Sequence, residues 1–180
     1  MQIYTIGHST RTVAELLALL RVHGVRTLAD IRSIRRSRAN PQFEEAALRK
    51  ALGRRYVVIP ELGGRRGRPA RPPRLANDAW EHASFRNYAD HALTREFRAG
   101  LTRLLALRGP VAIMCAEAVW WRCHRRIVAD HLLARRVPVA HILSARAAAP
   151  ATLTPFAVVE RGRVHYPRRG RTPAGRRDRP

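Results

Sequence analysis

The stretch that decides the fold is residues 111–130, VAIMCAEAVWWRCHRRIVAD. Residues 111–114 form a short apolar run, rich in β-branched side chains, that predicts a fully buried strand. Cys115 closes this run, and a short connection leads into an amphipathic helix predicted over 122–136. Ligands of open parallel sheets bind at the carboxyl ends of the strands. We therefore expect a chemical site where this strand ends and the helix begins.

On both sides of this stretch the chain alternates predicted strands and helices. Strands are expected over 2–6, 26–31, 56–59, 111–114 and 138–143, and helices over 13–20, 41–52, 84–107 (two pieces joined near Thr94) and 122–136. Ser9 or Thr10 is expected to cap the first helix, and Pro41 suits the first turn of the second. This order predicts an α/β fold with a mostly parallel sheet and helices on both faces.

The 180 residues predict one α/β domain over 1–145 followed by an extension. Residues 146–167 include a hairpin expected over 154–166 that turns at Arg161-Gly162. Residues 168–180 have no apolar periodicity and predict a disordered basic tail. Residues 60–77 are rich in Gly, Pro and Arg, so they predict no regular element and suggest a binding lid or a mobile segment.

The net charge of +22 arises from 35 Lys and Arg against 13 Asp and Glu, and Lys50 is the only lysine. An arginine bias of this kind is expected of a GC-rich coding sequence, whereas the dense runs 32–38, 65–74 and 168–179 suggest a phosphate or nucleic-acid footprint. Both interpretations stay open.

We expect a cytoplasmic protein with reduced thiols. The chain contains two cysteines, and its first residues lack the basic start and apolar stretch of a signal peptide. No apolar run approaches the roughly 20 residues that span a bilayer, so no membrane association is expected.

Several reactive side chains follow the predicted strands. His8 and Ser9 follow the first, Asp30 and Arg32 end the second, Glu61 follows the third, and Cys115 and Glu117 end the fourth. Because the carboxyl ends of parallel strands share one edge, we expect these groups to meet in one crevice.

Two sets of candidate site residues follow from this convergence. The catalytic candidates are Cys115, Glu117, Cys123, His124, Asp30 and His8, and the substrate-binding candidates are Ser9, Arg32, Arg38, Arg125, Trp120 and Trp121. Cys123 is the better nucleophile, because the first turn of a helix and two cationic neighbours favour a thiolate. Each candidate has a structural alternative: an inert thiol, a core histidine, an ion-pair partner or a packing tryptophan.

The chain also resembles a known family. The matching pieces are Tyr4-Thr5-Ile6-Gly7-His8-Ser9, Asp30-Ile31-Arg32-Ser33 with Ser37-Arg38 and Phe43, Leu62-Gly63-Gly64, residues 85–97, Cys115-Ala116-Glu117 with Cys123-His124-Arg125, and Val139, His141 and Ile142. On these motifs, spread over residues 2–143, the chain resembles the DUF488 family of small prokaryotic proteins of unknown function. The resemblance implies an α/β fold and a site at the motifs, but no established reaction. The chain departs from the family pattern at Arg35, where proline is usual, and at Val119-Trp120-Trp121, where an acidic residue and proline are usual.

Three function classes fit these residues. The preferred hypothesis is an enzyme-like protein acting on an anionic substrate such as a nucleotide or nucleic acid, although the spacing after Cys115 does not match a phosphatase loop. The second is a metal site using Cys115, Cys123 and His124; against it, the spacing is unfamiliar and adjacent side chains point about 100° apart on a helix. The third is a non-catalytic nucleic-acid-binding module. We assign no metal ligand, cofactor or oligomeric state from the sequence.

Overall fold

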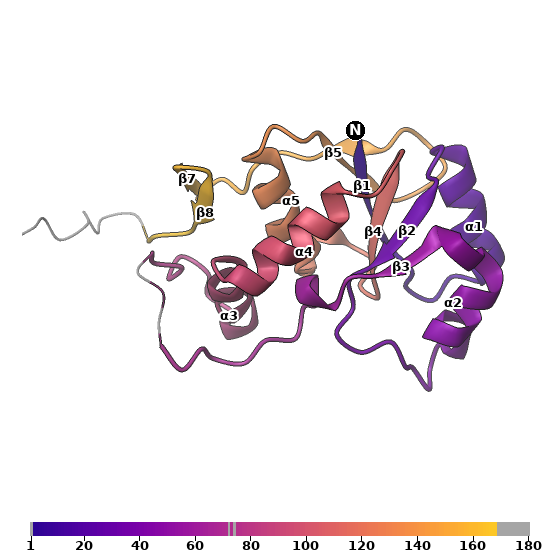
Figure 1. Cartoon of the computed structure of the whole chain (residues 1–180), viewed down its shortest axis with the longest axis horizontal. Helices are drawn as coiled ribbons and strands as arrows, with labels where there is room; N and C mark the ends of the chain where they lie inside the picture. The colour runs from indigo at the N-terminus through magenta and orange to yellow at the C-terminus, as the bar shows by residue number, and fades with distance from the viewer. Residues whose placement is uncertain (1, 72, 74, 169–180) are drawn as a thin grey trace, which may run out of the picture.

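The computed structural model describes residues 2–71, 73 and 75–168, and it is built on one six-stranded sheet (Figure 1). The strand order is β3-β2-β4-β1-β5-β6. All neighbouring strands are parallel except β6, which runs antiparallel to β5. The strands are β1 (Ile3–Gly7), β2 (Thr27–Asp30), β3 (Tyr56–Val58), β4 (Val111–Cys115), β5 (Val139–Ile142) and β6 (Ala149–Pro150). The predicted fold class is confirmed, and β6 is the one strand of this sheet that was not expected.

Helices cover both faces of the sheet (Figure 1). One core lies under α1 (Val13–Val22) and α2 (Glu45–Leu52), and the other lies under α3 (Ala83–Ala92), α4 (Arg95–Leu105) and α5 (Arg125–Leu133). Successive strand residues point to opposite faces, so β4 sends Ala112 and Met114 into the first core and Val111 and Ile113 into the second. This burial on both sides explains why β4 is an uninterrupted apolar run.

The starts of the first two helices differ from the predictions. Thr12, not Ser9 or Thr10, caps α1: its side chain accepts the Glu15 N–H, and the Glu15 carboxylate accepts the Thr12 N–H. The helix predicted over 41–52 is split, because Glu44 is extended (φ −63°, ψ 152°) between a 3₁₀ turn at Pro41–Phe43 and α2. Thr94 caps α4 at the predicted break between α3 and α4.

The start of α5 was also predicted wrongly. A 3₁₀ turn covers Trp120–Arg122, Cys123 is extended (φ −129°, ψ 146°), His124 is the N-cap, and α5 begins at Arg125. Cys123 therefore lies before the helix and not in its first turn. Two more 3₁₀ turns cover Gly53–Arg55 and Pro60–Leu62, the latter inside the segment for which no regular element was predicted.

The predicted C-terminal hairpin is present as β7 (Val158–Glu160) and β8 (Arg163–His165). It turns at Arg161 and Gly162, whose φ angles are 48° and 73°. Just beyond β8, the Tyr166 hydroxyl donates to Asp130 of α5 at 2.8 Å. Of the tail predicted over 168–180, only Arg168 lies within the described residues. None of the described helices is long and apolar enough to cross a bilayer.

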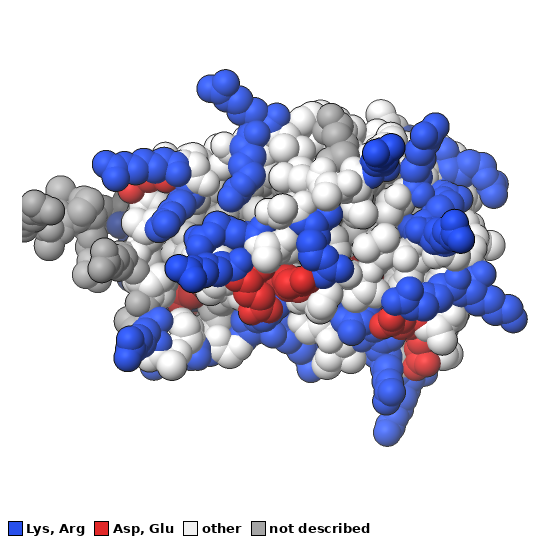
Figure 2. Space-filling model, in the orientation of Figure 1, with Lys and Arg blue, Asp and Glu red and all other residues white. Residues whose placement is uncertain are grey.

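Basic side chains are spread over the face shown in Figure 2, with acidic groups in a few places between them. Several acidic side chains of the protein hold arginines in ion pairs. Glu45 contacts Arg35 and Arg49, and Glu61 contacts Arg103. The sequence holds 13 Asp and Glu against 35 Lys and Arg, so carboxylates are too few to pair with every guanidinium group.

A buried histidine makes the fold sensitive to acid. Burial lowers the pKa of His131 on α5 to about 3. Its folded pKa lies below the usual 6.5, so the unfolded chain takes up a proton first as the pH falls, and stability is lost below about pH 6.5. At pH 5 this linkage amounts to about 2 kcal/mol. Between pH 7 and pH 5 the free energy of unfolding should therefore fall by about 2 kcal/mol less in His131→Leu than in the wild type. Urea denaturation at the two pH values measures this difference.

The control for this experiment is His82→Asn, which removes an exposed histidine and should keep the wild-type pH dependence. Equal pH dependence in His131→Leu and the wild type would contradict the prediction.

Candidate functional site

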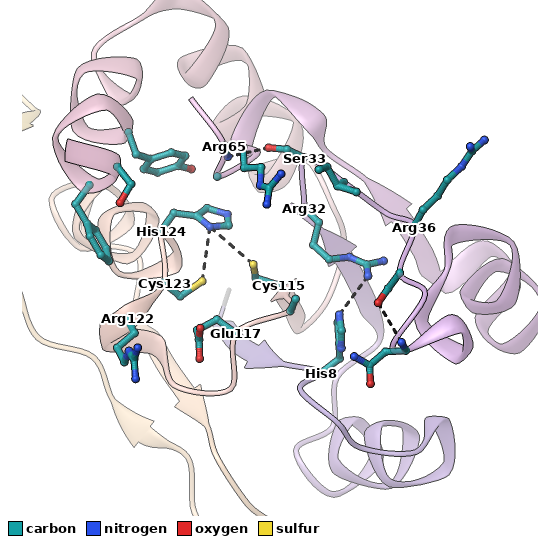
Figure 3. Close-up of a pocket in the computed structure, with 18 residues that line it drawn as sticks. His8, Arg32, Ser33, Arg36, Arg65, Cys115, Glu117, Arg122, Cys123 and His124 are labelled. Atoms are coloured by element: carbon teal, nitrogen blue, oxygen red, sulfur yellow. Dashed lines mark hydrogen bonds between the residues drawn. The ribbon is translucent and has the colours of Figure 1, made fainter. Parts of the chain in front are cut away.

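A cavity of about 530 Å³ lies at the carboxyl ends of the central strands (Figure 3). Segments that are distant in sequence form its walls: the residues after β1, β2, β3 and β4, the start of α3 and the residues before α5. His8, Arg32, Cys115, Glu117, Cys123 and His124 all line it. Six of the predicted site residues therefore meet in one cavity.

The sulfur atoms of both cysteines approach the same nitrogen. His124 Nδ1 lies 3.6 Å from Cys123 Sγ and 3.8 Å from Cys115 Sγ, and Figure 3 shows both side chains directed at the ring. The other ring nitrogen, Nε2, lies 3.1 Å from the Ile31 carbonyl oxygen. A carbonyl oxygen only accepts hydrogen bonds, so Nε2 carries a proton and donates it. The opposite nitrogen, Nδ1, faces the two sulfurs.

This convergence depends on the backbone just before α5. The extended conformation of Cys123 turns its side chain toward that of His124, which helical geometry would not do. The loop after β3 packs directly on the imidazole at Gly64, where any Cβ would clash with the ring. On another side the ring meets buried Tyr88 at a centroid distance of 4.9 Å. His124 is thus held in place by the fold.

Arg125 organises the neighbouring loop. Its guanidinium is buried, with Nε donating to Cys123 Sγ at 3.2 Å and Nη2 donating to the carbonyl oxygens of Glu117 and Ala118. The same loop passes so close to Gly7 that a Cβ there would clash with the Glu117 carbonyl. Arg125 was predicted to bind substrate, but it is not among the residues that line the cavity.

The two thiols have opposite pKa shifts. Burial opposes ionisation of Cys123, but the hydrogen bond with Cys115 and the charges of His124 and Arg125 outweigh it, so the pKa of the Cys123 thiol lies well below its usual value. The hydrogen bond with Cys123, together with burial, raises the pKa of the Cys115 thiol well above its usual value. Of the two thiols, Cys123 is therefore the one that favours the thiolate.

A second buried network borders the cavity. Arg32 donates to both carboxylate oxygens of Asp30, and its Nη1 lies 3.2 Å from His8 Nε2. His8 Nδ1 lies 2.9 Å from the Ser9 carbonyl oxygen, so Nδ1 donates and Nε2 accepts from Arg32. Burial, with a contribution from Arg32, lowers the pKa of His8, which keeps the ring neutral. Tyr56 donates to Asp30 at 2.5 Å. Asp30 lies outside the cavity lining and orients Arg32.

The remaining predicted residues lie around the cavity. Ser9, which has φ 52°, donates its N–H to the Ala116 carbonyl and so joins the loops after β1 and β4. Arg38 is exposed. Trp120 stacks on His141 at 4.1 Å. Trp121 is 47% exposed and lines a second hollow of about 540 Å³ with Trp80 and Arg126. Base stacking on the tryptophans stays a prediction.

Several residues that line the cavity were not among the candidate site residues: Ser33, Arg36, Gly64, Arg65, Tyr88 and Arg122. Ser33, Gly64 and Tyr88 do lie in the segments that carry the family resemblance. Arg36 and Arg65 belong to the basic runs noted above, which was a usable signal. Apart from the resemblance over residues 85–97, Tyr88 carried no chemical signal, because an aromatic residue on a helix is usually a core residue. Its burial and its hydroxyl hydrogen bond to the Leu62 carbonyl depend on tertiary packing.

Three of the lining arginines have free guanidinium groups. Arg36, Arg65 and Arg122 make no ion pair or side-chain hydrogen bond with another residue in the described part of the chain. All three are exposed. In Figure 3, the Arg65 side chain projects between His124 and Arg32, whereas Arg36 points outward. The cavity therefore presents uncompensated positive charge beside the sulfurs.

Comparison with known proteins identifies the family. The DUF488 family model, described as a domain of unknown function, matches residues 12–132. The chain belongs to the DUF488 family. No curated protein and no solved structure matches it. The DUF488 match includes both cysteines, His124 and Arg32, and it leaves His8 and the C-terminal hairpin outside its bounds. The family description names no reaction, so the chemistry of the site must be argued from its geometry.

The buried guanidinium of Arg125 leads to a prediction about stability. A hydrogen bond that involves a charged group contributes about 1.5–3 kcal/mol, and lysine cannot reproduce the fork of an arginine. Arg125→Lys should therefore lower the free energy of unfolding by about 2–4 kcal/mol, measured by urea denaturation.

The matched control is Arg122→Lys, three residues away and exposed, which should change stability by less than about 0.5 kcal/mol. Similar stability of the two variants would show that the Arg125 contacts do not hold the loop.

Proposed function

We propose that this DUF488 protein is an enzyme that binds an anionic substrate in the strand-edge cavity, with Cys115, Cys123 and His124 as its reactive centre. The substrate class is a phosphate-bearing molecule such as a nucleotide or nucleic acid. The observation that carries the proposal is the juxtaposition of this centre with guanidinium groups that have no partner among the described residues.

Electrostatics favours an anion in this cavity. Unpaired guanidinium groups bind phosphate and carboxylate oxygens through charge-assisted, often bidentate hydrogen bonds. Arg65 and Arg122 line the cavity on different segments, after β3 and before α5, so one anion could be held from two sides. Arg32 contributes less charge, because the carboxylate of Asp30 neutralises it. The exposed Glu117 carboxylate at the same cavity would disfavour an anion placed directly beside it.

The chemical groups suit group transfer or hydrolysis. Thiolate sulfur and imidazole are the commonest nucleophile and acid–base groups of cysteine enzymes. The neutral His8 ring, oriented by Ser9 and Arg32, adds a second imidazole at the wall of the cavity. A module that only bound nucleic acid would have no need for this buried arrangement of sulfur and imidazole, because phosphate binding requires surface charge alone.

The proposal is tested with inorganic pyrophosphate as a probe of anion binding. The wild-type chain should bind pyrophosphate in isothermal titration calorimetry, and Arg65→Ala should weaken binding about 10- to 100-fold, because each charged hydrogen bond contributes about 1.5–3 kcal/mol. Arg122→Ala should have a similar effect.

The control is Arg68→Ala, an exposed arginine of the same loop that lies outside the cavity lining. Arg68→Ala changes the net charge by the same amount as Arg65→Ala. It should leave the affinity for pyrophosphate within about twofold of the wild type, since it alters only the long-range charge of the surface. Equal weakening by Arg65→Ala and Arg68→Ala would mean that pyrophosphate binds the basic surface at large, and it would overturn the proposed anion site.

A further inference from the structure

The geometry of the reactive centre points to a ligand that the sequence argued against. We propose that Cys115, Cys123 and His124 bind one zinc ion with tetrahedral geometry, and that its fourth position opens into the cavity. The inference deepens the proposed function by naming a cofactor for the same site, and it rests on that proposal only for the role of the open position.

The interatomic distances agree with zinc coordination. With Zn–S bonds of about 2.3 Å and Zn–N bonds of about 2.0–2.1 Å, a tetrahedron places sulfur and nitrogen ligands about 3.5–3.6 Å apart. The observed Nδ1–Sγ distances are 3.6 Å to Cys123 and 3.8 Å to Cys115. All three ligand atoms lie within 4.8 Å of one another, so small side-chain rotations would complete the triangle.

The objection raised from the sequence does not hold in the structure. Adjacent residues on a helix diverge by about 100° and cannot share a metal. Cys123 is extended and His124 is only the N-cap, so their side chains converge. The unfamiliar Cys-x7-Cys-His spacing follows from the loop and the 3₁₀ turn of Trp120–Arg122 between β4 and α5.

Groups around the triad have the roles expected next to a metal. Metal-bound histidines usually donate their second N–H to a carbonyl or carboxylate, and His124 Nε2 donates to Ile31 O. Arg125 Nε donates to Cys123 Sγ, as a hydrogen-bond partner of a metal thiolate would.

The coordination chemistry balances without any further residue. Both cysteines would bind as thiolates, any proton still held by a thiol, above all that of Cys115, would pass to solvent, and the two negative charges would neutralise Zn²⁺. The described part of the chain offers three ligands in this cluster, as catalytic zinc sites do, and structural sites have four. Because all three residues line the cavity, water or a substrate oxygen can reach the fourth position.

The test is performed on the full chain. Purified protein is analysed for zinc by mass spectrometry, stripped with a chelator and titrated with Co²⁺. We expect one metal ion per chain, with the visible d–d absorption of tetrahedral cobalt and thiolate-to-cobalt charge transfer in the near ultraviolet. Absence of the charge-transfer band would overturn the inference.

Ligand variants locate the site. Cys115→Ser and His124→Asn should each weaken Co²⁺ binding by more than the 10- to 100-fold that loss of a second-shell contact costs. Cys115 is partly exposed, so its variant should fold even if Cys123→Ser does not. His82→Asn, an exposed histidine outside the cluster, should bind Co²⁺ like the wild type. Unchanged affinity in Cys115→Ser would overturn the assignment.

The open position is tested with azide. Added azide should shift the d–d bands of the cobalt protein, because it can occupy the fourth position; an unchanged spectrum would contradict an open site. Failure of this inference differs from failure of the proposed function, since pyrophosphate binding depends on Arg65 and Arg122. Metal binding without pyrophosphate binding would support the zinc site alone, and the reverse result would support the anion site alone.

Discussion

The site depends on one buried cation. Arg125 is 1% exposed, and its hydrogen-bond partners are two backbone carbonyls and one sulfur. A buried charge is costly unless an opposite charge compensates it. The compensating group in direct contact is Cys123, so the fold favours a negatively charged sulfur at this position. The Arg125 side chain thereby joins the loop after β4 to the residues just before α5.

The architecture and much of the site could be predicted from periodicity and strand ends. Strand β4 and the cysteine at its carboxyl end could be predicted because a buried parallel strand is a continuous apolar run. His8, Arg32 and Cys115 could be placed together because parallel strands end at a common edge. What the pattern could not show was the residue at which α5 begins. A helical assignment that started three residues early changed the expected direction of the Cys123 side chain and led to the expectation that the Cys123 and His124 side chains diverge.

Tertiary contacts explain the other differences. Trp120 and Trp121 are adjacent and alike in sequence, yet one stacks on His141 and the other faces solvent. Gly64 owes its role to the imidazole that packs against it, a neighbour 60 positions along the chain. The cap of α1 could not be predicted from residue type alone. Serine is a common helix cap, but Ser9 has a left-handed backbone conformation and joins two loops. Thr12 caps the helix instead, through reciprocal side-chain to backbone hydrogen bonds with Glu15.

The C-terminal hairpin has a consequence for how this protein could be shortened. Asp130 sits in the middle of α5, and its carboxylate accepts from the Thr154 N–H and the Tyr166 hydroxyl. A chain that stopped at the family boundary near residue 132 would strip both donors from a buried acid. The helix that starts beside the cysteines would then carry an unsatisfied charge in its centre. Residues beyond the segment matched by the family model thus stabilise the helix that follows Cys123 and His124.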